Sequence, residues 1–369
     1  MDGDLPPYGP RSTSTVFGQD DAQIEFLEAY RADRLHHAWL ITGPKGIGKA
    51  TLAWRIVKFL LCTAMDSKES PACDRKSVVS LDVPEDHPVA KRIEAATEPT
   101  AFGIARSPSP ISGRMRKVIP IDDIRELQSF FSLTSAEGLP LVAVIDSPDE
   151  MNRHSANAML KLLEEPPDNA YLLLVSHSPE RLLPTIRSRC RRLFCKPLSD
   201  RNMSNALRQL NLELPKDIHP LVSLSEGSVG TAAELISEGG LELHSRIIEV
   251  LSGAPGMDRG KMLSLAEGFE GMQSANDFEI GLKLMSLCVA RLARAAATNG
   301  IQPVKFSEQE TLMFNKLTLK PQAAKIWAEL HERFIASAAD SLLTNINPAS
   351  SIIDMCLEFE DSAIRASAA

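Results

Sequence analysis

The stretch that decides the fold is AWLITGPKGIGKATLAWRIVKFLLC, residues 38–62. It opens with an apolar run typical of a buried strand, passes through a glycine-rich loop, and continues with apolar residues at helical spacing. Strand, glycine loop and helix in this order form a phosphate-binding loop, because backbone N–H groups and the positive end of the helix converge on the phosphates. The segment therefore predicts a nucleotide-binding α/β domain.

The loop departs from the phosphate-loop pattern Gly-x-x-x-x-Gly-Lys-[Ser/Thr] at its last position. Ala50 stands where a hydroxyl normally binds Mg²⁺, and Thr51 lies about 100° further round the helix, so it cannot substitute. Lys49 can still reach phosphate oxygens. Binding of ATP or ADP with Mg²⁺ stays open, whereas efficient hydrolysis is not expected. The loop glycines are Gly43, Gly46 and Gly48.

Two further apolar runs, LVAVID at 141–146 and YLLLVSH at 171–177, are predicted to be central parallel strands that are buried on both faces. Between them, NRHSANAMLKLLEEPP at 152–167 has one apolar helical face and ends at paired prolines. Alternating strands and helices favour a parallel sheet with helices on both sides.

The second strand ends at Asp146, where P-loop ATPases carry the aspartate that holds Mg²⁺. The next residue in such enzymes is usually a glutamate that orients or deprotonates the attacking water, and here it is Ser147. Together with Ala50, this second loss argues against a working ATPase.

Composition places the chain among globular proteins, with 369 residues, 44% apolar, 24% charged and a net charge of −8. This balance excludes a broad basic face for nucleic acids. No run approaches the roughly 20 apolar residues of a membrane span, and the first residues lack the features of a signal peptide, so a cytoplasmic protein is expected. The six scattered cysteines are interpreted as reduced thiols.

Helical patterns dominate after residue 196, where no strand signal recurs. We predict an α/β nucleotide-binding-like domain over 1–196, with a partly mobile insertion at 64–117 that is rich in serine, proline and charge. A small helical lid over 197–240 and an all-α oligomerisation domain over 241–369 follow. The expected helices are 199–211, 217–238, 241–252, 257–272, 275–298, 321–345 and 350–366.

The segment TIRSRC at 185–190 presents Arg187 and Arg189 after the third strand. An arginine at the edge of a nucleotide-binding domain can reach the γ-phosphate held by a neighbouring subunit, where its fixed charge stabilises the transition state. A solvated basic turn is the alternative, because Arg191 and Arg192 follow directly. The residues alone favour that alternative.

Three segments together resemble clamp-loader subunits of the AAA+ superfamily, closest to the delta-prime type of the bacterial DNA polymerase III holoenzyme. The resemblance covers about the first 235 residues. It implies a subunit that helps to load the sliding clamp onto primed DNA in replication, beside gamma or tau ATPase subunits and a delta subunit, with the C-terminal helices as a collar. The segments are RADRLHHAWLITGPKGIGKATLA (31–53), VIDSPDEMNRHSANAMLKLLEEPP (144–167) and SPERLLPTIRSRC (178–190).

The resemblance favours the trans-acting role for an arginine of this segment over the solvated basic turn. In clamp loaders the arginine of Ser-Arg-Cys is supplied to ATP in the adjacent subunit, which implies this motif for Ser188, Arg189 and Cys190 and the finger role for Arg189. Ser176 resembles the sensor 1 residue at the end of the third strand. Thr231 stands near the position where an ATPase subunit carries its sensor 2 arginine, a third departure from an active motor.

Many delta-prime relatives bind Zn²⁺ through four cysteines after the first helix. Only Cys62 and Cys73 lie in that region here, and His87 could add one further ligand. A structural zinc site needs four ligands, so no metal site is expected.

Two alternatives stay open. A motor ATPase subunit of the same loader predicts Ser or Thr at position 50 and Glu at position 147, and neither is present. A small-molecule P-loop kinase needs a substrate pocket and a mobile lid, whereas this chain continues into a long helical region suited to assembly.

Overall fold

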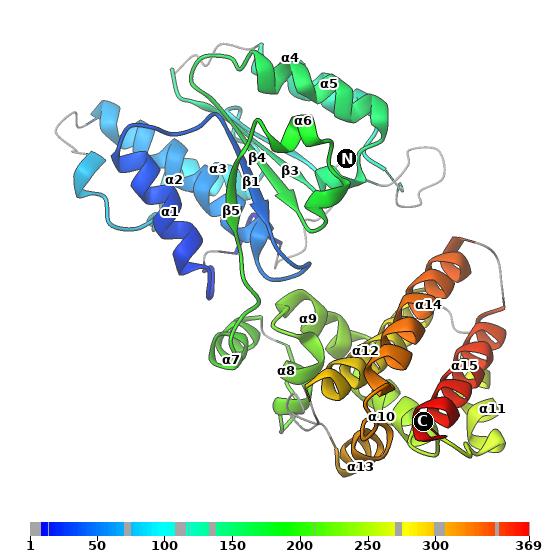
Figure 1. The fold of residues 1–369 in the computed structure, drawn as a ribbon. Helices are drawn as coiled ribbons and strands as arrows, with labels where there is room; N and C mark the ends of the chain where they lie inside the picture. Colours follow the sequence, from blue (N-terminus) through cyan, green and yellow to red (C-terminus); the bar gives the residue numbers. More distant parts are fainter. Residues whose placement is uncertain are drawn as a thin grey trace. The chain divides into compact units, whose positions relative to one another are not determined.

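The computed structural model contains two compact units (Figure 1). Each unit has buried apolar side chains of its own. The first unit comprises Met1–Ala206 with Gly227–Gly230, and the second comprises Leu207–Glu226 with Thr231–Ala369. The boundaries expected at residues 196 and 240 remain predictions. The residues that the structure describes are 9–13, 15–69, 75–107, 116, 118–132, 138–210, 212–269, 275–298, 307–343 and 347–368.

A five-stranded parallel sheet forms the centre of the first unit, in the order β2-β3-β4-β1-β5, which confirms the predicted parallel sheet. The three inner strands are those expected from their apolar runs. The two edge strands were not predicted, because AFGI is short and RRLF begins with two charges, so neither is a long apolar run. The strands are β1 Ala38–Thr42, β2 Ala101–Ile104, β3 Leu141–Asp146, β4 Ala170–Ser176 and β5 Arg191–Phe194.

Helices cover both faces of this sheet, as Figure 1 shows. On one face α4, α5 and α6 bury Ile124, Leu163 and Ile186 against the strands. On the other face lie α1, α2 and α3, and the Phe26 ring of α1 packs 5.1 Å from that of Trp39. The helices of this part are α1 Asp20–Arg31, α2 Lys49–Glu69, α3 Pro88–Glu94, α4 Ile121–Phe131, α5 Arg153–Glu164, α6 Pro184–Arg187 and α7 Asp200–Gln209, with short 3-10 turns η1 Arg75–Ser77, η2 Pro148–Glu150 and η3 Pro179–Arg181.

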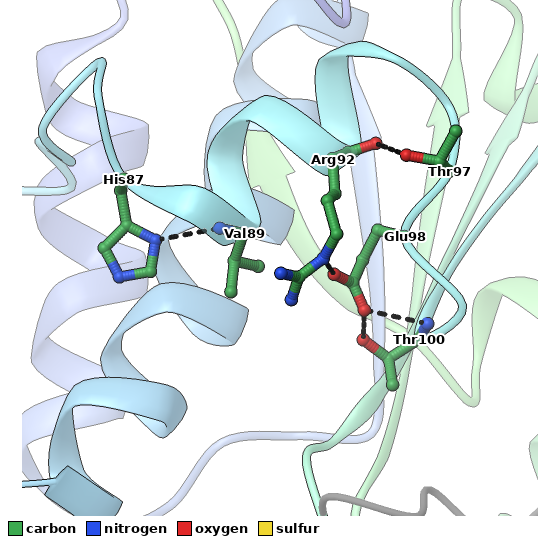
Figure 2. A network of polar contacts seen from close by, with 6 residues as sticks. All are labelled: His87, Val89, Arg92, Thr97, Glu98 and Thr100. Atoms are coloured by element: carbon green, nitrogen blue, oxygen red, sulfur yellow. Dashed lines mark hydrogen bonds and ion pairs between the residues drawn. The ribbon is translucent and has the colours of Figure 1, made fainter.

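A small polar network joins α3 to the edge strand β2 (Figure 2). The His87 ring accepts a hydrogen bond from the Val89 N–H and so caps α3. The buried Glu98 carboxylate pairs with Arg92 Nε at 2.7 Å and accepts the Thr100 hydroxyl hydrogen bond at 2.6 Å. These elements fall within the range 64–117, which therefore contains regular structure that the sequence pattern did not predict.

The second unit is helical, and its described residues include no strand, which confirms the predicted helical C-terminal part. Its core includes Trp327, whose ring lies 5.0 Å from Phe359 and whose Nε1 donates to the Leu317 carbonyl at 3.0 Å. Of its described helices, only α13 was not predicted; the expected break at Pro303 lies outside the described residues. The described helices are not long and apolar enough to cross a membrane. They are α8 His219–Ser225, α9 Val229–Ser237, α10 Gly240–Leu251, α11 Arg259–Glu267, α12 Ala275–Ala297, α13 Glu308–Leu317, α14 Ala323–Leu343 and α15 Pro348–Ala368.

Candidate functional site

The predicted phosphate loop lies between the carboxyl end of β1 and the start of α2. Gly43, Gly46 and Gly48 have φ angles of 147°, 75° and 95°, a region that residues with a Cβ rarely adopt. The loop glycines are therefore required by the backbone conformation itself. Ala50 and Thr51 are half-buried in the first turn of α2, where Ala50 offers no oxygen.

Lys49 is buried at the base of this loop, where its Nζ donates a hydrogen bond to the Pro44 carbonyl. Burial lowers the pKa of this amine, while Cys195, Asp146 and Asp149 act to raise it. A phosphate that displaced the Pro44 carbonyl would meet a cation already held inside the site.

The segment Gly227–Gly230 lies directly against the loop. The Gly230 N–H donates to the Gly46 carbonyl at 3.0 Å, and a Cβ built on Gly46 would come within 2.3 Å of the Ser228 hydroxyl oxygen. This is the beginning of the stretch that resembles sensor 2, and Thr231 follows in the first turn of α9. Glycine at position 46 thus allows a close backbone contact as well as the loop conformation.

Gln19, a residue that the sequence analysis missed, fixes the loop from the amino-terminal side. Its side chain is 2% exposed; Nε2 donates to the carbonyls of Ile47 and Lys196 at 3.1 and 2.9 Å, and Oε1 accepts from the Lys196 N–H at 3.1 Å. One amide therefore joins the phosphate loop to the segment after β5. No local pattern marks Gln19, because its partners lie 28 and 177 residues away.

Asp146 ends β3 beside Lys49, at the position predicted for the Mg²⁺-binding aspartate. Burial raises the pKa of its carboxyl, and the nearby Lys49 and His177 oppose that shift. Ser147 follows in a left-handed conformation, with φ 64°, and its hydroxyl lies 3.5 Å from the Asp146 carboxylate. A serine hydroxyl cannot accept a proton as a glutamate does, so the site lacks the usual general base.

Asp149, which the sequence analysis did not promote to a catalytic role, is buried beside this site. Its side chain is 1% exposed, and His177 Nε2 lies 3.2 Å from Oδ2, without hydrogen-bonding geometry. Within the described residues, neither Asp149 oxygen nor the hydroxyl of the buried Ser176 has a hydrogen-bond partner. Buried polar atoms without partners are costly, so they are consistent with a site built for a polar ligand.

These residues fit the phosphates of a nucleotide better than they fit its metal. The glycine loop, Lys49 and the Ser176 hydroxyl can face phosphate oxygens, whereas the Asp149 carboxylate has the same sign of charge as a phosphate and does not contribute to this fit. The hydroxyl that would complete a Mg²⁺ site is missing at Ala50.

The described residues include no group of three or more His, Cys, Asp or Glu side chains arranged to hold a metal. Cys62 is buried, and His87 caps α3 while facing Asp66 at 3.2 Å. Cys73 lies outside the described residues.

Arg189 lies at the opposite end of the strands from the phosphate loop. Arg191, two residues later in β5, pairs in register with Trp39 near the start of β1, whereas the loop follows Thr42 at the far end. The strands are parallel and rise about 3.3 Å per residue, so roughly 13 Å of strand separates the two levels. Arg189 therefore cannot serve the nucleotide site of its own chain.

The guanidinium of Arg189 is held by two acceptors. Nη2 lies 2.9 Å from Glu164 Oε1, and Nη1 donates to the Thr185 carbonyl at 3.1 Å, which also accepts from the Ser188 hydroxyl at 3.2 Å. Cys190 packs against the core beneath, and burial raises the pKa of its thiol to about 12. Of the three motif residues, Arg189 and Ser188 form polar contacts, and Cys190 packs against the apolar core.

The fold and the site define a class of protein. A parallel sheet ordered β2-β3-β4-β1-β5, with a phosphate loop after β1 and an acidic residue ending β3, is the arrangement of P-loop proteins of the AAA+ class. The family model described as DNA polymerase III, delta subunit matches residues 18–199.

Curated relatives agree with that match. DNA polymerase III subunit delta' of Pseudomonas aeruginosa PAO1 is 34% identical over 214 residues, which are 58% of this chain and 60% of the relative. DNA polymerase III subunit tau of Escherichia coli K12 is 28% identical over 333 residues, which are 86% of this chain and 44% of the relative. Residues 18–199 are therefore similar to the clamp-loader family of AAA+ proteins, including its delta' members.

The chain spans about half the length of the curated relatives it matches. Among solved structures, a DNA polymerase III gamma subunit-related protein from Thermotoga maritima is 16% identical, with a TM-score of 0.39 and coverage of 92% of this chain and 99% of that one. A TM-score of this size provides no evidence for the fold class, which is assigned from the strand order of the sheet.

Proposed function

We propose that this chain is a delta-prime-type clamp-loader subunit that supplies Arg189 to ATP bound by a neighbouring subunit. The observation that carries the proposal is the position of Arg189 just before the amino end of β5, remote from its own phosphate loop. An adjacent subunit could bring its nucleotide to that end of the strands. A planar, permanently charged fork of N–H donors suits a γ-phosphate.

The same proposal makes the chain a poor ATPase itself. Lys49 and the loop amides would hold phosphates, and Asp146 would face a Mg²⁺ ion, which when bound would neutralise phosphate charge. Ala50 and Ser147 supply neither the metal-binding hydroxyl nor the base for water. Binding of ATP or ADP is compatible with the site, and fast turnover is not.

The rival role is a motor subunit of the same loader. The tau relative aligns with more of this chain than the delta' relative does, so similarity alone does not separate the two roles. The residues at positions 50, 147 and 231 favour the delta-prime role. Similarity to clamp-loader subunits over residues 18–199 argues against a small-molecule kinase.

The proposed partners follow from this role. They are gamma or tau ATPase subunits and a delta subunit, with the sliding clamp and primer–template DNA reached through the assembly. The helical second unit would serve as the collar that joins the subunits, consistent with its lack of any strand in the described ranges.

The test is reconstitution of the clamp loader with its partner ATPase subunits. Arg189→Ala is expected to lower DNA-stimulated ATP turnover and clamp loading by roughly tenfold or more, since arginine fingers contribute strongly to phosphoryl transfer. Arg189→Lys should restore little, because an ammonium lacks the planar fork. Arg187→Ala, a neighbouring exposed arginine, is the matched control.

The purified chain provides the second arm of the test. It should turn over ATP only at background level, with no change on Lys49→Ala. ATP turnover at the rate of a motor subunit, abolished by Lys49→Ala, would favour the rival role. Clamp loading at the wild-type rate by Arg189→Ala would rule out the arginine-finger role of Arg189.

A further inference from the structure

We infer that Glu164 is a positioning residue for Arg189, an inference that rests on the proposed function. Glu164 is the last residue of α5, and its Oε1 lies 2.9 Å from Arg189 Nη2. The Thr185 carbonyl holds the other terminal nitrogen, Nη1, at 3.1 Å. A side chain with many rotamers is thereby held at two points of its planar group.

Both ends of this contact stand on rigid supports. Leu163, next to Glu164, is buried in the core, and its carbonyl lies 3.1 Å from the His37 ring nitrogen Nε2, which donates to it in the Nε2-protonated tautomer. On the other side, the fully buried Ile186 anchors α6, and its carbonyl accepts a hydrogen bond from the Arg189 N–H at 3.1 Å. The backbone segments that carry Glu164 and Arg189 are thus fixed to the same core.

The geometry leaves Arg189 free to bind a second anion. A guanidinium has five N–H donors, and these two contacts use two of them. The side chain of Arg189 is 36% exposed and that of Glu164 49% exposed, so solvent screens the ion pair and its contribution to folding is small. The contact with Glu164 instead orients the remaining N–H donors of the Arg189 guanidinium.

Neighbouring charges do not share this arrangement. Arg191 contacts Glu25 at 3.5 Å and lies over the Trp39 ring. Glu165, adjacent to Glu164, is exposed and forms no ion pair within the described residues. The pair Glu164 and Glu165 therefore offers a matched comparison of two neighbouring carboxylates with different contacts.

The experiment uses the reconstituted clamp loader and measures DNA-stimulated ATP turnover against ATP concentration. Glu164→Gln should lower kcat about two- to fivefold with little change in KM, because the finger reaches its productive orientation less often. Glu164→Asp should recover part of the loss, and Glu165→Gln should match wild type. In the Arg189→Ala background, Glu164→Gln should cause no further loss.

The outcomes separate the inference from the function on which it rests. Unchanged turnover in Arg189→Ala removes the finger and the inference with it. If Arg189→Ala does lower turnover, three results for Glu164→Gln would overturn the positioning role alone. These are a kcat equal to that of Glu165→Gln, a kcat above that of wild type, or a further loss of kcat in the Arg189→Ala background. Equal thermal unfolding of wild type and Glu164→Gln shows that any kcat loss is not a folding defect.

Discussion

At the residue scale, the candidate site has the backbone of a phosphate loop but lacks two groups that ATP hydrolysis normally uses. The positive φ angles of Gly43, Gly46 and Gly48 preserve the phosphate loop. Position 50 carries no hydroxyl, and position 147 carries a hydroxyl in place of a carboxylate. We therefore expect nucleotide binding without fast hydrolysis at this site.

Gly46→Ala tests the close contact between the loop and the segment Gly227–Gly230. The added Cβ would lie 2.3 Å from Ser228 Oγ and 3.1 Å from the Gly230 Cα, at a φ of 75°. Overpacking and backbone strain should lower the free energy of unfolding by about 1–3 kcal/mol. Chemical denaturation of the full chain measures this.

Gly48→Ala is the matched control, because its Cβ would meet no atom within 4 Å and the variant would carry backbone strain alone. Ser228→Ala should restore part of the stability lost in Gly46→Ala. Equal losses in the two glycine variants would contradict the close contact.

At the element scale, predictability follows the length and purity of the apolar pattern. The inner strands could be predicted from their continuous apolar runs, and most helices from apolar residues at helical spacing. The edge strands β2 and β5 could not, because their conformation depends on pairing with neighbours. Likewise Asp146 and Lys49 follow from motif spacing, whereas Gln19 acts through contacts distant in sequence.

Helix α5, which ends at Glu164, begins with a side-chain cap that can be tested. Asn152 Oδ1 accepts a hydrogen bond from the Ser155 N–H at 2.9 Å. Asn152→Ala should destabilise the chain by about 1 kcal/mol, while Asn152→Asp should stay within a few tenths, because aspartate also caps. Urea unfolding provides the comparison, with the exposed Asn205→Ala as control. A neutral Asn152→Ala would refute the cap's contribution.

At the scale of the whole molecule, the second unit carries an acid-sensitive group of its own. His244 on α10 is 1% exposed, and burial, with Arg291 on α12 adding to it, lowers its pKa to about 3. Arg291 in turn lies 3.2 Å from the buried Glu310 on α13. A proton on His244 would thus enter an environment that already holds a cation.

Acidification should therefore destabilise the second unit. Between pH 6.5 and about 3 the unfolded state binds a proton at His244 that the folded state does not, so stability falls as pH falls through this window. One such group contributes a slope of up to about 1.4 kcal/mol per pH unit. Urea unfolding at pH 7, 6 and 5 should show a smaller slope in His244→Gln, and an unchanged slope would exclude His244 as the cause.

The two ends of the parallel strands carry different groups in this chain. Its phosphate loop faces one way along the strands and Arg189 faces the other, so identical contacts repeated between neighbours would run head to tail. A subunit that supplies an arginine to its neighbour, but has no hydrolytic site to receive an arginine from the next subunit, would stand at the end of such a row of subunits. Under the proposed function this chain would mark the terminus of an open arc of subunits, and the direction in which ATP sites follow one another would be set by the direction of its strands.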